Sequence, residues 1–169
     1  MYTCRLHIYF AGHPSHAFDV IKKMPSLEKF THIFSESDEA EVSLSQKADV
    51  IIADLSHMDM ASSLQIFLSN RRAGTEVILL ADKKQMQSLC SSPALKDITD
   101  IWIMPMSDEE LRFRFLRWQQ TCKMSKDLRE TSHFLEATIN NIPNLIWYKD
   151  KEGVHEKVNN SFCQAVNKT

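Results

Sequence analysis

The chain has 169 residues, 43% of them hydrophobic, and a formal net charge of −2. This length allows one full domain with its own core and a smaller second unit. The lack of a basic excess argues against nucleic acid as a partner, and the lack of a polybasic segment argues against an anionic membrane surface. No apolar run approaches the roughly 18 residues of a membrane span, and the N-terminus has no secretory signal pattern. We therefore expect a cytoplasmic protein.

Cysteine and glycine usage excludes several kinds of site. The four cysteines lie far apart without a C-x-x-C pair, which is typical of free thiols and not of a zinc ribbon. With only three glycines, neither G-x-G-x-x-G nor a Walker pattern occurs. No Ser-His-Asp or Cys-His arrangement can be identified. We expect no cofactor and no enzymatic activity in this chain.

Short apolar runs alternate with longer mixed segments along the first two thirds of the chain. We predict strands at 4–11, 31–36, 49–54, 76–82 and 100–104. We predict helices at 15–30, 37–47, 59–74 and 83–92, with caps or stops at Ser37, Asp38, Gly74, Asp82 and Pro93. This alternation predicts an α/β fold, a doubly wound parallel sheet of order 2-1-3-4-5. In that order the ligand crevice lies outside the carboxyl ends of the first and third strands.

Three segments occur in a characteristic order, "DVIIADLSHMDM", "EVILLAD" and "DIWIMPMSDEEL". In order and spacing they resemble strands three, four and five of a response-regulator receiver domain, and the resemblance covers residues 1–119. It implies that Asp54 occupies the position of the phosphoacceptor. It also implies that Pro105 is the proline that follows the family's strand-five lysine.

The other positions of the receiver site depart from the family pattern. Where receivers hold Mg²⁺ with two acidic residues, the segment "FAGHP" places Ala11 and Gly12. The hydroxyl residue that binds the phosphoryl group is replaced by Ala81, and the lysine by Met104. Because phosphoryl transfer depends on positioning and charge neutralisation, we interpret the domain as a degenerate receiver that is not phosphorylated. The alternative is a phosphorylatable receiver of a histidine kinase phosphorelay.

Several histidines and carboxylates occur in the two loops that are predicted to flank the crevice. Imidazole and carboxylate groups suit zinc and other transition metals. A second alternative is therefore a small-ligand or metal sensor that uses His13, His16, Asp54 and His57. Solvated polar loop residues are the simpler interpretation of the same pattern.

From Ser107 to about Asn141 the chain contains neither Pro nor Gly, which predicts a helix far longer than the average of about 11 or 12 residues. Ser107 is its expected N-cap. We expect Leu111 and Phe115 to pack on the sheet. The apolar stripe then continues with a shifted phase, and we expect it to form a parallel homodimer. The residues assigned to this dimer helix are Leu111, Phe115, Trp118, Cys122, Leu128 and Leu135. Two helices with a break near 125–127 are the alternative.

The last segment, "FLEATINNIPNLIWYKDKEGVHEKVNNSFCQAV", resembles the opening of a PAS sensory domain, with a helix, a strand, a turn, a strand and a helix. We therefore predict a receiver-like domain at 1–119, a long signalling helix at 107–141 and a PAS fragment at 135–169. This series resembles the input half of bacterial multidomain signalling proteins, whose outputs are GGDEF diguanylate cyclases or histidine kinases. The resemblance implies a regulatory input module with an upstream signalling partner and, as the favoured output, a diguanylate cyclase.

Overall fold

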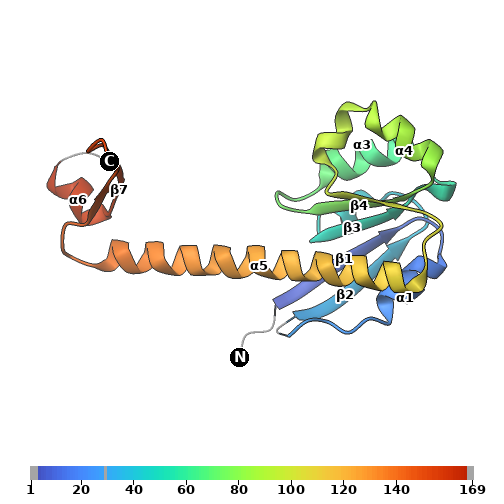
Figure 1. Cartoon of the computed structure of the whole chain (residues 1–169), viewed down its shortest axis with the longest axis horizontal. Helices are drawn as coiled ribbons and strands as arrows, with labels where there is room; N and C mark the ends of the chain where they lie inside the picture. The colour runs from blue at the N-terminus through green and yellow to red at the C-terminus, as the bar shows by residue number, and fades with distance from the viewer. Residues whose placement is uncertain (1–3, 29, 167–169) are drawn as a thin grey trace. The chain divides into compact units, whose positions relative to one another are not determined.

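The computed structural model describes residues 4–28 and 30–166 (Figure 1). The predicted domain ends at 1–3 and 167–169, and position 29 of the predicted first helix, lie outside the described residues. The chain divides into two compact units, Met1–Trp118 and Gln119–Thr169. The division falls within α5 (Asp108–Asn141), a helix of 34 residues without the alternative break near 125–127.

The first unit is built on a five-stranded parallel sheet of order β2-β1-β3-β4-β5. The strands are β1 (Cys4–Ala11), β2 (Phe30–Ser37), β3 (Val50–Asp54), β4 (Glu76–Ala81) and β5 (Asp100–Ile103). The predicted α/β doubly wound fold and its strand order are confirmed. Because the order reverses between β1 and β3, the crevice outside their carboxyl ends is the topological switch point.

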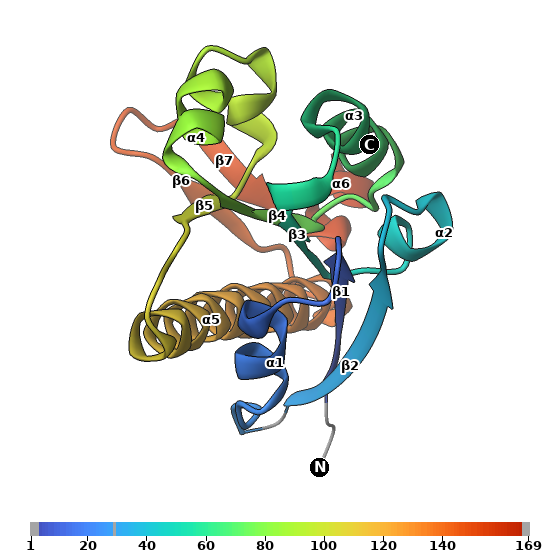
Figure 2. The same cartoon turned by 90° about the vertical axis from the view of Figure 1, so that its right-hand side faces the viewer.

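Helices cover both faces of the sheet (Figure 2). On one face lie α1 (His16–Lys22) and the first turns of α5, and the Phe10 and Phe18 rings meet there at 4.6 Å between centroids. The other face carries α2 (Val42–Ser45), α3 (Met60–Asn70) and α4 (Lys83–Cys90). Successive side chains of a strand point to opposite faces, so the continuous apolar runs of β3 and β4 supply core on both sides. Two 3-10 helices, η1 (Leu55–His57) and η2 (Pro93–Asp97), complete the connections.

The first two helices are much shorter than predicted. The first, α1, ends at Lys22, because Pro25 lacks an amide donor and disfavours helical geometry in the residue before it. The prediction that Ser37 and Asp38 cap the second helix was wrong. Ser37 pairs with Ala11 as the last residue of β2, and only four residues of α2 remain.

The ends of the next two helices test their predicted caps. The third helix stops at Asn70 with Arg71 in an extended conformation, so Gly74 is not its cap. Asp82, predicted as a helix cap, does cap α4: its carboxylate accepts from the amides of Lys84 and Gln85, both at 2.7 Å. The Gln85 side chain bonds back to the Asp82 amide and completes a capping box.

The second unit contains the rest of α5, an antiparallel pair of β6 (Trp147–Lys149) and β7 (His155–Val158), and α6 (Asn160–Ala165). The predicted order of strand, turn, strand and helix is therefore present. Every residue of both strands is exposed. Across residues 4–28 and 30–166, no helix combines the length and the hydropathy that crossing a bilayer requires.

Candidate functional site

The crevice at the switch point contains Asp54 as the last residue of β3. Its Oδ1 atom accepts a hydrogen bond from the Ser56 amide at 3.0 Å and another from the Ser56 hydroxyl. The carboxylate therefore caps η1. The carboxylate that the receiver resemblance places in the phosphoacceptor position thus has a local structural role that needs no ligand.

Gly12 lies close to Asp54 at the carboxyl end of β1. Its φ of +117° is one that L side chains rarely adopt, and its amide donates to the Ser37 carbonyl at 2.8 Å. A Cβ atom at this position would lie 2.8 Å from the backbone oxygen of Asp54 and 3.4 Å from the sulfur of Met58. No side chain fits here unless the backbone shifts, so the carboxylate that the receiver resemblance would require at this position is excluded sterically.

The other positions to which the receiver resemblance assigns a role carry apolar side chains. Ala11 and Ala81 are buried at the carboxyl ends of β1 and β4. The Met104 amide donates to the Ala81 carbonyl at 2.8 Å, and the peptide between Met104 and Pro105 is cis. The side chains of Ala11, Ala81 and Met104 supply neither the oxygen ligands nor the cation that phosphoryl transfer requires.

The structure brings together only part of the predicted metal-ligand set. The rings of His13 and His57 meet edge to face with centroids 5.4 Å apart, and His13 Nδ1 lies 3.8 Å from Asp38. His16, the first residue of α1, instead contacts Asp108 at the start of α5, with Nε2 2.7 Å from Oδ1. In the part of the chain that the structure describes, no three His, Cys, Asp or Glu side chains gather as a metal site would need. The set His13, His16, Asp54 and His57 is therefore not assembled.

A cavity of about 250 Å³ beside the crevice has an acidic rim that includes Asp38, Glu39 and Asp59. Asp59 caps α3, where the hydroxyl and then the amide of Ser62 donate to its carboxylate. These two hydrogen bonds hold the pKa of Asp59 below its ordinary value. This carboxylate is thus used to begin a helix.

One face of α5 is buried in the protein. Leu111 and Phe115 are fully buried, and the Phe115 ring contacts His32 and stacks on Trp118. The Trp118 indole donates to the Glu76 carboxylate at the start of β4. Because Trp118 and Cys122 are buried too, these four side chains cannot form the surface that a second copy meets. That part of the predicted dimer helix is corrected.

A second apolar stripe of α5 is exposed in the second unit. Met124 and Leu128 are 73% and 72% exposed, and Leu135 is 52% exposed. With the exposed residues Thr131 and Thr138 they follow spacings of four, three, four and three, and we call these five residues the seam. In the first unit, Phe113 and Leu116 are exposed as well, although the sequence analysis did not assign them to this surface. Phe113 and Leu116 are three residues apart and lie on a different face of the helix from Leu111. This spacing is the sequence signal from which their exposure could have been predicted.

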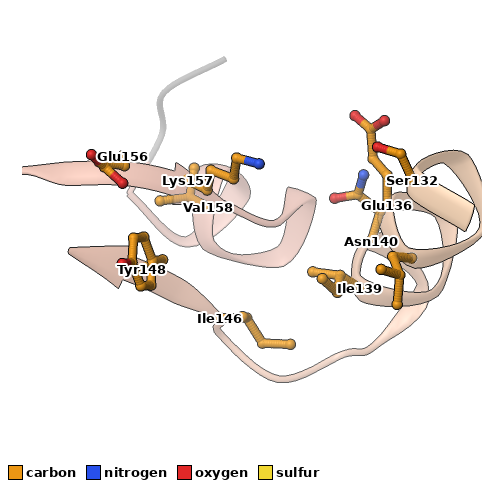
Figure 3. Close-up of a pocket in the computed structure, with 10 residues that line it drawn as sticks. Ser132, Glu136, Ile139, Asn140, Ile146, Tyr148, Glu156, Lys157 and Val158 are labelled. Atoms are coloured by element: carbon orange, nitrogen blue, oxygen red, sulfur yellow. The ribbon is translucent and has the colours of Figure 1, made fainter. Parts of the chain in front are cut away.

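Beside the seam, the second unit contains a groove of about 590 Å³ (Figure 3). One wall consists of α5 residues and the other of residues on and beside β6 and β7. The apolar lining residues are Leu135, Ile139, Ile146, Tyr148 and Val158. Polar groups at its edges are Ser132, Glu136, Asn140, Glu156 and Lys157. Leu135 belongs to both the seam and the groove.

The chain matches no family model and no curated protein. Sixteen chains of solved structures match it. One of them, from Burkholderia thailandensis E264, is described as a pilus assembly protein (cpaE). It is 13% identical, covers 69% of this chain and 98% of its own, and has a TM-score of 0.49. At this identity and TM-score the similarity carries no conclusion about function.

Proposed function

We propose that this chain is a regulatory input module that works by self-association through α5, with a receiver-like domain that is not phosphorylated. The observation that carries the proposal is the seam, a row of exposed side chains at helical spacing on a helix whose other side is buried in part. Burying one large apolar side chain contributes about 1.5–3 kcal/mol, so pairing two seams is favourable. Spacings of four and three match the repeat by which parallel helices pair.

The resemblances to a receiver and to a PAS opening support the rest of the proposal. In this arrangement α5 passes a change in pairing to the second unit, and from there to an output domain of the diguanylate cyclase or histidine kinase type. The chain itself acts on no substrate and requires no metal or cofactor. An upstream signalling protein supplies the change that the module relays.

The seam predicts the oligomeric state. Light scattering at micromolar concentration should give the mass of a dimer of the 19.5 kDa chain. Leu128→Glu combined with Leu135→Glu should give a monomer with an unchanged circular dichroism spectrum. In a parallel pair, each new carboxylate would face the same carboxylate of the second copy, and the like charges would repel.

The matched control adds the same two charges away from the seam. Ser125→Glu with Ala137→Glu changes two exposed residues of the same helix, and this variant should remain a dimer. A wild-type monomer throughout the concentration range, or a Leu128/Leu135 variant that still dimerises, would show that the seam is not the association surface.

The apolar residues Ala11, Ala81 and Met104 and the close approach of Gly12 predict that Asp54 takes up no phosphoryl group. After incubation with Mg²⁺ and acetyl phosphate, the intact mass of the wild type should equal that of the untreated protein. The Asp54→Asn variant, treated in parallel, should behave in the same way. A stoichiometric adduct on the wild type that is absent from Asp54→Asn would sink this part of the proposal.

A further inference from the structure

We infer that Asn159 is the residue that joins the end of α5 to β6 and α6, so that the end of α5 cannot move independently of these two elements. The inference rests on the proposed function in one respect, namely that α5 is the relay. Asn159 is fully buried, although the strand β7 that precedes it is exposed at every residue. The large side chains of β6 are also exposed, Trp147 by 51% and Tyr148 by 61%. The join therefore depends on hydrogen bonds more than on an apolar core.

The carboxamide of Asn159 bonds to three different parts of the unit. Its Nδ2 atom donates to the carbonyls of Ile139 and Ile142 at 3.2 Å and of Asn144 at 2.9 Å. These acceptors lie in the last turn of α5 and in the segment that follows it. Its Oδ1 atom accepts from the amides of Ile146 and Phe162, both at 3.1 Å. One side chain thus holds the end of α5, the approach to β6 and the first turn of α6.

Only a carboxamide meets all of these requirements. It carries two N–H donors and one acceptor oxygen, and here the donors face carbonyls while the oxygen faces amides. An aspartate has the same shape but no donor when ionised, so its carboxylate would face three carbonyl oxygens. A buried polar group left without a partner is costly, and the loss extends to every member of a connected network.

Two neighbouring contacts reinforce the same join. The Ser161 hydroxyl donates to the Ile142 carbonyl, and the Asn160 amide donates to the Asn140 side chain, each at 3.0 Å. A rotation or shift of the last turn of α5 must therefore move the start of α6 and the residues that lead into β6. These contacts give a movement of α5 a physical means of changing the positions of β6 and α6.

Hydrogen–deuterium exchange of the whole chain tests the inference. In Asn159→Asp, the Ile146 amide should exchange about tenfold faster or more, because a carboxylate facing the three carbonyls opens the network, whereas Phe162 should stay protected because aspartate also caps a helix. Peptides from the first unit should exchange as in the wild type. The control Asn160→Ala changes an exposed neighbour whose backbone amide makes the bond, and it should leave exchange at both amides unchanged.

A second variant separates the cap of α6 from the join. Serine is a good N-cap but is too short to reach the carbonyls of α5, so Asn159→Ser should protect Phe162 while Ile146 exchanges fast. Wild-type exchange at Ile146 in both Asn159→Asp and Asn159→Ser would overturn the inference. Light scattering on the same samples reports self-association separately. A monomeric wild type whose Ile146 amide depends on Asn159 would therefore contradict the proposed function alone.

Discussion

Replacing Phe115 by alanine is expected to lower the free energy of unfolding by about 3–5 kcal/mol. Phe115 is fully buried, and its ring lies between His32 of β2 and Trp118 one turn further along α5. Removing the ring leaves a cavity between helix and sheet and takes away both aromatic contacts. Denaturant unfolding followed by tryptophan fluorescence measures the loss, since Trp102 and Trp118 are in the same unit.

The matched control lies two residues away on the same helix. Phe113 is 63% exposed, so Phe113→Ala should change the free energy of unfolding by no more than about 0.5 kcal/mol. Both substitutions are best made in the Leu128→Glu and Leu135→Glu background, because self-association would otherwise contribute to stability. Similar losses for the two phenylalanines would mean that the buried face of α5 is assigned incorrectly.

Introducing a carboxylate with Gly12→Asp, as the receiver resemblance would require, is expected to destabilise the protein and to create no Mg²⁺ site. The unusual φ of Gly12 costs a side chain about 1–3 kcal/mol. The Cβ atom would in addition lie 2.8 Å from the Asp54 backbone oxygen, where only a backbone shift relieves the contact. Adding Mg²⁺ should therefore leave the melting temperature of Gly12→Asp unchanged, since a ligand that does not bind cannot stabilise the folded state.

Two alanine variants separate the causes of this loss. Gly12→Ala carries the backbone strain and the close contact without the added charge. Gly74→Ala carries strain alone, because Gly74 has a φ of +87° and a Cβ atom there would have no described neighbour within 4 Å. Gly12→Ala should accordingly unfold at a lower denaturant concentration than Gly74→Ala. Equal midpoints, or a Gly12→Asp protein that Mg²⁺ stabilises, would show that the crevice can open.

The two apolar surfaces of α5 have separate roles in this view. Leu111, Phe115 and Trp118 attach the helix to the sheet of its own chain. Leu128 and Leu135 stay exposed and are the side chains that we propose to meet a second copy. A helix used in both ways connects folding of the first unit with association, which is what a relay between units requires.

Local sequence determined the elements of this protein that depend on near neighbours. The apolar runs of β3 and β4 predicted buried strands, since parallel strands covered on both faces need such composition. The absence of Pro and Gly after Ser107 predicted the length of α5, and Asp82 was predicted correctly as a cap of α4. The crevice was predicted from topology, because the carboxyl ends of β1 and β3 meet at one edge of the sheet.

Tertiary structure alone decided the features that depend on residues distant in sequence. Helical spacing shows that α5 has two apolar stripes, but only packing shows that Leu111 to Cys122 is the buried one. The contact of His16 with Asp108 and the approach of Gly12 to Asp54 each join segments that are far apart in the chain. Asn159 resembles an ordinary helix cap in sequence, and its role follows from carbonyls that the end of α5 brings to it. Spacing defines which side chains share a face, whereas long-range contacts define what each face touches.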